Sequence, residues 1–98
     1  MSPKKNNDNI IAFLKKERAN KYDDIEKNIL NELYKICINT IKIINESNKT
    51  EYIYEVPSFI PDYPLYNIED ISIKLNKILK KKGFSTTYIP INKIYIKW

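Results

Sequence analysis

The strongest constraint on the fold comes from one stretch, residues 23–46. At about 100° per residue, its apolar side chains fall within one helical arc of about 180°. Ile38 lies outside that arc and Glu26 intrudes on it. Because the arc is wider than the stripe of an ordinary surface helix, we expect a main helix that packs on two flanks. Its members are Ile25, Ile29, Leu30, Leu33, Tyr34, Ile36, Cys37, Ile41, Ile43 and Ile44.

The chain before this stretch predicts a separate, shorter helix. We expect the main helix to begin at Asp23, with Glu26 completing a capping box. The apolar side chains of Asn9–Arg18 (Ile10, Ile11, Phe13 and Leu14) do not share the main arc. A break near Asn20–Tyr22 is therefore predicted, although no glycine or proline enforces it.

The second half predicts strands, a loop and a capped helix. Glu51–Val56 alternates as a strand, and three prolines then impose an extended loop over 57–66 that lies across the core. A helix over Ile68–Lys82 has Asn67 as N-cap and Gly83 beyond its C-terminus. The last residues predict a hairpin with strands Phe84–Ile89 and Ile94–Trp98, and a packed Trp98.

These elements predict an α+β fold. We expect the order helix(es)–strand–Pro-rich loop–helix–β-hairpin, with a three-stranded antiparallel sheet covered by helices on one face. A chain of 98 residues forms one small domain, predicted over 9–98 after a flexible polar and basic start at 1–8. The alternative is a winged-helix-like order, although its middle helix would fall on the three-proline segment.

The composition excludes several classes of protein and site. No apolar run reaches the roughly 18 residues of a membrane span, and the N-terminus lacks the apolar core of a signal peptide. We therefore expect no membrane and no secretion. One cysteine and no histidine exclude an internal disulfide, a Cys/His zinc site and a Ser-His-Asp triad. Cys37, inside the apolar arc, is predicted to be buried and unreactive.

No residue pattern predicts catalysis. The carboxylate pairs Asp23/Asp24 and Glu69/Asp70 fall in first helical turns, where the helix dipole explains them. The single glycine, Gly83, excludes glycine-rich phosphate loops. We expect a non-enzyme with no catalytic residues, no cofactor and no metal.

The net charge of +5 allows a nucleic-acid partner as the alternative function. Part of this excess reflects composition, because Ile, Lys and Asn supply 47 of the 98 residues. Candidate phosphate contacts on the second helix and hairpin are Lys74, Lys77, Lys80, Lys81, Lys82, Lys93 and Lys97.

Eight tyrosines indicate a protein partner instead. Tyrosine is enriched at protein interfaces, because it is apolar along its ring and polar at its tip. The apolar, acidic segment 51–66 and neighbouring outward side chains form the candidate partner surface. Its members are Tyr52, Tyr54, Phe59, Tyr63, Tyr66 and Ile73.

Residues 52–98 carry a series of short motifs in a distinctive order. They are Tyr54-Glu-Val-Pro57, Pro64-Leu-Tyr-Asn67 opening a helix, Gly83-Phe84, and Asn92 before Ile94-x-Ile-x-Trp98. In these motifs the chain resembles a family of short, functionally uncharacterised proteins of nucleocytoplasmic large DNA viruses. The resemblance implies expression in an infected host cell, in the cytoplasmic virus factory or in the virion. It implies no catalytic or binding residues.

Together these observations predict a small viral protein that acts through protein–protein contacts. It would be a virion or assembly component or an adaptor, with a viral protein or a second copy of itself as partner.

Overall fold

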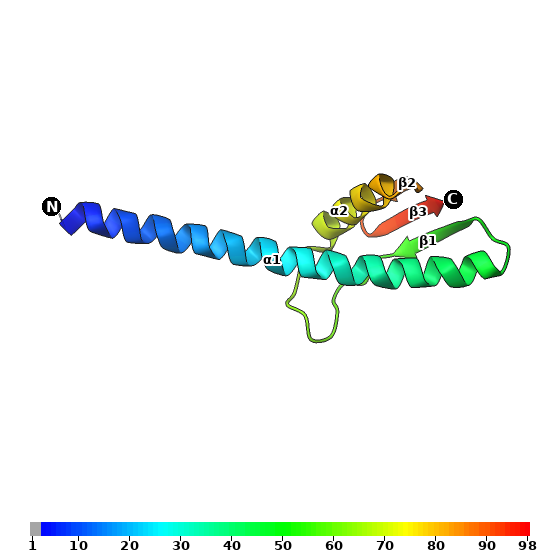
Figure 1. Ribbon diagram of the computed structural model, residues 1–98, viewed down its shortest axis with the longest axis horizontal. Coiled ribbons are helices and arrows are strands. Elements are labelled where there is room, and N and C mark those ends of the chain that lie inside the picture. Colours follow the sequence, from blue (N-terminus) through cyan, green and yellow to red (C-terminus); the bar gives the residue numbers. More distant parts are fainter. Residues whose placement is uncertain (1–2) are drawn as a thin grey trace.

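The first 46 residues are dominated by one long helix (Figure 1). The computed structural model describes the backbone of residues 3–98 and the side chains of residues 10–18, 21 and 23–98. Helix α1 spans Pro3–Glu46, 44 residues, an ideal length of about 66 Å. The longest dimension of the molecule is 70 Å. Only the C-terminal half of α1 lies against the other elements, so residues 3–24 project from the domain.

The predicted break near Asn20–Tyr22 and the predicted helix start at Asp23 are wrong, because α1 runs through both. No glycine or proline occurs between residues 4 and 46. Once the packed half of a helix has formed, each further residue needs only propagation, without a new nucleus. The flexibility of residues 1–8 stays a prediction: the backbone from Pro3 is helical, and residues 1 and 2 lie outside the described part.

Three short strands form one antiparallel sheet. They are β1 (Glu51–Glu55), β2 (Ser85–Ile89) and β3 (Lys93–Lys97), in the order β1-β3-β2. Strand β3 is therefore central, and its Ile94 lies opposite Tyr54 on one side and Tyr88 on the other. The fold class predicted from the sequence is confirmed: the protein is α+β with a three-stranded antiparallel sheet.

Both helices cover the same face of the sheet. Alternation along the strands turns one set of side chains inward and leaves the other set exposed. The inward set forms one core with α1 and α2 (Ile68–Lys81), and Ile60, Tyr63 and Tyr66 of the loop pack against it. The core residues are Ile29, Leu33, Cys37, Ile41, Tyr54, Val56, Ile71, Leu75, Leu79, Ile94 and Ile96.

Local signals fix both ends of α2. The Asn67 side chain accepts a hydrogen bond from the Asp70 amide at 3.0 Å, as an N-cap does. At the other end Gly83 has φ +102°, and the amides of Gly83 and Phe84 donate to the carbonyls of Lys80 and Leu79. This pair of bonds is the Schellman motif. Both predicted caps are confirmed.

The end of the sheet packs onto the end of α1. The rings of Phe84 and Trp98 meet edge to face at 6.5 Å, and the Trp98 indole donates to Asn45 at 3.1 Å. The segment between β1 and α2 contains no helix. The three-helix core of a winged-helix domain is therefore absent from residues 3–98.

Candidate functional site

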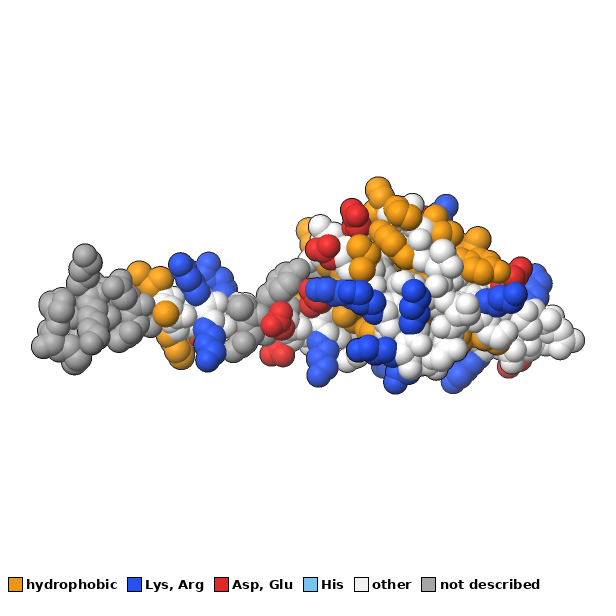
Figure 2. All heavy atoms as spheres, turned by 90° about the horizontal axis from the view of Figure 1, so that it is seen from above, with side chains coloured by type: hydrophobic (Ala, Val, Ile, Leu, Met, Phe, Trp, Pro, Cys, Tyr) orange, Lys and Arg blue, Asp and Glu red, His pale blue; other side chains and the backbone are white. Residues whose placement is uncertain are grey.

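The projecting half of α1 carries an apolar cluster near its free end. We call Ile10, Ile11, Phe13 and Leu14 the tip cluster; their side chains are 57%, 50%, 65% and 48% exposed. Figure 2 shows apolar side chains on this part of the helix, followed toward the domain by Lys and Arg. Every described side chain from 10 to 18 is exposed, so the cluster contributes nothing to the core.

A second, mainly apolar feature runs along residues 14–43 of α1. At about 100° per residue, six of the described side chains of α1 fall within one arc of about 40°, which we call the outer stripe. The stripe is centred about 100° from the row that faces the core, Ile29, Leu33, Cys37 and Ile41. Its members are Leu14, Arg18, Ile25, Glu32, Ile36 and Ile43, and all but the half-buried Glu32 are exposed.

The proline loop of the domain contacts one charged side chain of this stripe, Glu32. The Tyr63 hydroxyl donates to the Glu32 carboxylate at 3.4 Å, so the proline loop flanks the stripe at this level. Burial of its ring, followed by the neighbouring carboxylate, raises the pKa of Tyr63. The Tyr63 hydroxyl therefore stays protonated and donates to the half-buried Glu32.

The structure distributes the predicted partner surface over different environments. Tyr54 is buried, and Tyr52, Tyr63 and Tyr66 are half-buried against the core. The Tyr66 hydroxyl donates to the Pro57 carbonyl within the loop. Ile73 on α2 is half-buried, and Phe59 is 59% exposed. Most of this set supports the domain, and Phe59 is its most exposed member.

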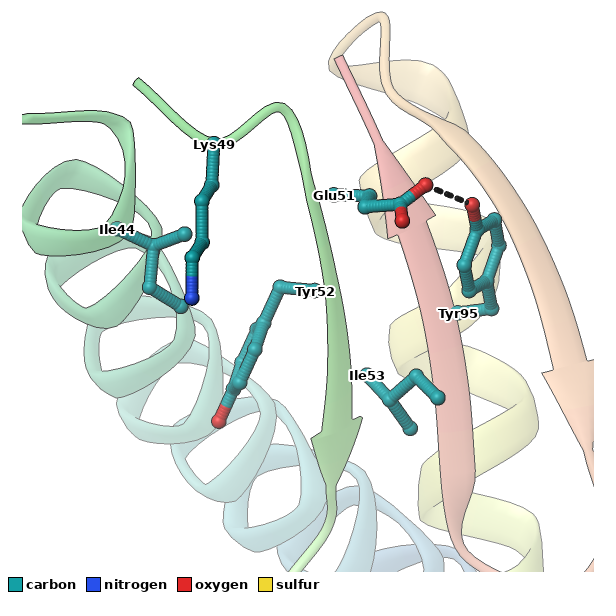
Figure 3. A pocket seen from close by; sticks show the side chains of 6 residues that line it. All are labelled: Ile44, Lys49, Glu51, Tyr52, Ile53 and Tyr95. Carbon is teal, nitrogen blue, oxygen red and sulfur yellow. Dashed lines mark hydrogen bonds between the residues drawn. The ribbon is translucent and has the colours of Figure 1, made fainter. Parts of the chain in front are cut away.

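A shallow hollow of about 360 Å³ lies at the β1 edge of the sheet. Figure 3 shows Tyr52 between β1 and α1, while Glu51 and Tyr95 are joined by a hydrogen bond on the outer face. The lining residues are Ile44, Lys49, Glu51, Tyr52, Ile53 and Tyr95. The lining has one carboxylate, Glu51, and one ammonium, Lys49, among apolar and aromatic side chains. It does not bring together a pair of carboxylates for general acid–base catalysis.

The candidate phosphate contacts separate into two groups. Lys74, Lys77, Lys80, Lys81 and Lys82 belong to α2 and its C-cap, which cover the inner face. Lys93 and Lys97 lie on the outer face of β3, opposite Glu55 and Glu51 of β1. Lys74 forms an ion pair with Glu26, and the Lys82 ammonium lies 5.7 Å from the Tyr34 ring centre. The seven lysines therefore do not converge on one patch.

Cys37 is confirmed as a buried side chain. Burial raises the pKa of its thiol to about 12, which leaves it protonated and unreactive near neutral pH. No group of three or more metal-binding side chains occurs among the described ones. No described helix is long and apolar enough to cross a membrane.

The tip cluster and the outer stripe of α1 were not predicted from the sequence. The signal was present, because Ile10, Phe13 and Leu14 lie off the main arc, whereas Ile11, 18 residues from Ile29, lies on it. The change of apolar direction was interpreted as a break in the helix. A straight helix with apolar side chains on a second face gives the same sequence pattern. Ile25 and Ile36 were assigned to the core, but they lie at the margin of the wide arc and are 36% and 40% exposed.

The fold and these surfaces define a small α+β protein with a projecting helix. The chain belongs to DUF5759, a family of unknown function, whose model matches residues 9–80. The match includes most of the projecting part of α1 and ends within α2. No curated protein and no solved structure matches the chain.

Proposed function

We propose that this protein is a non-enzymatic adaptor or assembly component that acts through protein–protein contacts, with the projecting half of α1 as its docking element. The observation that carries the proposal is the tip cluster: four exposed large apolar side chains on the half of α1 that projects from the domain. Residues 3–24 extend about 33 Å beyond the domain, which gives a partner access to the helix from all sides.

Physical chemistry favours a bound state for such a helix. Isolated helices of this length are marginal in water, so most of their stability comes from packing an apolar face. Contiguous exposed apolar side chains are typical of interaction sites, and helices that dock in grooves use anchors spaced three and four residues apart. Ile10, Phe13 and Leu14 have that spacing.

The cellular setting belongs to the same proposal. The resemblance of residues 52–98 to short proteins of large DNA viruses supports a role in an infected host cell, in the cytoplasmic virus factory or in the virion. Fractionation of infected cells and purified virions, followed by detection of this chain, tests the setting.

The contact function is tested with paired variants of the full chain. Wild-type protein, an Ile10→Asp/Phe13→Asp double variant and the control Ile53→Asp are used to capture partners from infected cells. Ile53 is 51% exposed on the outer face of the sheet, so its variant tests an unrelated apolar position. A partner retained by the control and lost with the double variant supports the proposal. Equal capture by all three proteins contradicts it.

Nucleic-acid binding is the second candidate. It is favoured by Lys77, Lys80 and Lys81, which are exposed along the C-terminal half of α2, and by the net charge of +5. Titration with duplex and single-stranded DNA at two salt concentrations tests it, since phosphate contacts weaken steeply with salt. Absence of binding at low salt removes this candidate.

A further inference from the structure

Five of the six outer-stripe residues of α1, between Leu14 and Ile36, are arranged symmetrically about Ile25. Leu14 and Ile36 each lie 11 residues from Ile25, on opposite sides. Arg18 and Glu32 each lie seven residues from it, again on opposite sides. Between residues 14 and 36, apolar positions are therefore matched with apolar positions and the basic position with the acidic one, whereas Ile43 falls opposite position 7, an asparagine.

This arrangement is the pattern that an antiparallel two-fold pair of identical helices requires. In such an isologous contact, residue i of one copy meets residue j of the other, and j meets i. We infer that α1 pairs antiparallel with α1 of a second copy of this chain, with the two-fold axis at Ile25. Leu14 then lies against Ile36 of the second copy, and Arg18 against its Glu32. The inference goes beyond the proposed docking of the tip cluster, because it concerns the outer stripe and uses only Leu14 of that cluster.

The charges beside the stripe agree with the same register. Glu17 and Lys35, both exposed, lie on one flank of the stripe. In the pair, Glu17 of one copy falls within two residues of the position opposite Lys35 of the other. Flanking charges of this kind select partner and orientation in paired helices. Parallel pairing would instead place Arg18 beside Arg18 and Glu32 beside Glu32.

The rest of the domain leaves this side of α1 accessible. The side chains of Ile25 and Ile36 are 36% and 40% exposed, and that of Leu14 is 48% exposed. Glu32 is held by Tyr63 at the edge of the stripe, so its carboxylate is already positioned for Arg18 of the second copy. Phe13 points about 100° away from Leu14 on the helix, so the pairing leaves it free for another partner.

Sedimentation of the full-length protein from micromolar to millimolar concentration is the first test. The expected result is a reversible dimer with twice the 11.7 kDa mass of the chain. Ile25→Asp is expected to weaken dimerisation at least about tenfold, since it places two carboxylates at the axis. Phe13→Asp, off the stripe, is expected to leave dimerisation unchanged. A chain that stays monomeric throughout this range overturns the inference.

Charge exchange tests the pairing of Arg18 with Glu32. Arg18→Glu and Glu32→Arg are each expected to weaken the dimer, and the double variant is expected to restore it. Circular dichroism melting of each variant controls for folding, because Glu32 also accepts a hydrogen bond from Tyr63. Loss of dimerisation that the double variant does not restore, in folded proteins, counts against this register.

Cross-linking tests the orientation. Ile25→Cys is expected to form a covalent dimer with a short bismaleimide, whereas Leu14→Cys is expected to form none with itself. Two Leu14 positions lie 22 residues apart along an antiparallel pair, about 33 Å. The native Cys37 is buried and serves as an internal control. Cross-linking of both variants would indicate parallel pairing and overturn the inference. The tip-cluster experiment with Phe13 and Ile10 is read separately, so a monomeric chain still leaves the contact function open to its own test.

Discussion

Single side chains in the core set the chemical reactivity of this protein. Cys37 is completely buried between α1 and the rest of the core, and burial raises the pKa of its thiol from 9.0 to about 12. Desolvation penalises the thiolate, so the native state favours the protonated form.

We therefore expect Cys37 to resist a thiol reagent at pH 8 in the native protein and to react fully in denaturant. The same shift gives a pH dependence. Because the unfolded thiol ionises near pH 9 and the folded one near 12, the free energy of unfolding falls as the pH rises through this interval. Urea titrations between pH 8 and 11 measure this fall, which Cys37→Ala should make shallower. A native thiol that reacts at the rate of a free cysteine contradicts the prediction.

Thr86 offers a stabilising substitution. It is 9% exposed on the inner face of β2, and its hydroxyl has no hydrogen-bond partner. A buried hydroxyl without a partner costs free energy, and valine has nearly the same shape and a high strand preference. Thr86→Val should raise the free energy of unfolding by about 1 kcal/mol, measured by chemical denaturation. Thr87→Val, on the exposed face, is the control and should change it little.

Secondary-structure elements differ in how far they depend on local signals. Helix α2 was predicted within one residue because its cap residues act over a few positions: Asn67 at one end and Gly83 at the other. The N-terminal half of α1 has no such signals, and the predicted break relied on a change of apolar direction alone. That change reflects two different environments along one straight helix, which periodicity cannot distinguish from a bend.

The cap of α2 gives a prediction at this scale. Asn67→Ala removes the side-chain oxygen that accepts from the Asp70 amide, and it should cost about 1 kcal/mol of unfolding free energy. Asn67→Ser keeps an accepting oxygen at this position and should retain most of the stability. Thermal and urea unfolding of the two variants make the comparison. Equal losses would show that the hydrogen bond itself contributes little.

The strand faces were also predictable, but the strand order was not. Alternation placed Tyr54 and Val56 on one face of the first strand and Ile94 and Ile96 on one face of the last, as the structure confirms. The pairing of β1 with β3 brings together segments almost 40 residues apart. No local residue pattern encodes such a contact, because it depends on the shape of the whole core.

The whole molecule is an elongated body made of a packed domain and a projecting half-helix. Its radius of gyration is 18.6 Å, whereas a compact domain of this length has about 13 Å. The tip cluster and the outer stripe were hard to predict because half of α1 projects from the domain. The apolar residues of α1 have the same chemistry in both halves, and only the finished domain determines which of them are covered.

Removal of residues 1–24 should leave the domain folded. The described side chains from 10 to 24 are exposed, and the Glu26–Lys74 ion pair lies beyond the cut. The unfolding free energy should change by less than about 0.5 kcal/mol, as measured by urea denaturation. Loss of cooperative unfolding in the shortened chain would mean that the projecting half supports the core.

Trp98 closes the opposite end of the molecule. Its ring packs against Phe84 and its indole donates to Asn45, so it joins β3 to the end of α1. Trp98→Ala should cost about 2 kcal/mol, below the 3–5 kcal/mol of a fully buried aromatic residue. Trp98→Phe should recover part of this loss, because it keeps the ring contact without the indole donor. Melting temperatures of both variants provide the measurement.

The central position of β3 has a consequence for synthesis on the ribosome. Strands β1 and β2 each pair only with β3. Strand β1 therefore cannot pair until α2, β2 and β3 have been translated. The hydrogen bonds of α1 are local and do not involve β3, although the helix takes most of its stability from packing its apolar face. A nascent chain therefore exposes the core-facing apolar side chains of α1 before the sheet that covers them has formed. During that interval these side chains are open to non-native contacts, as unburied apolar surface is in a partly folded chain.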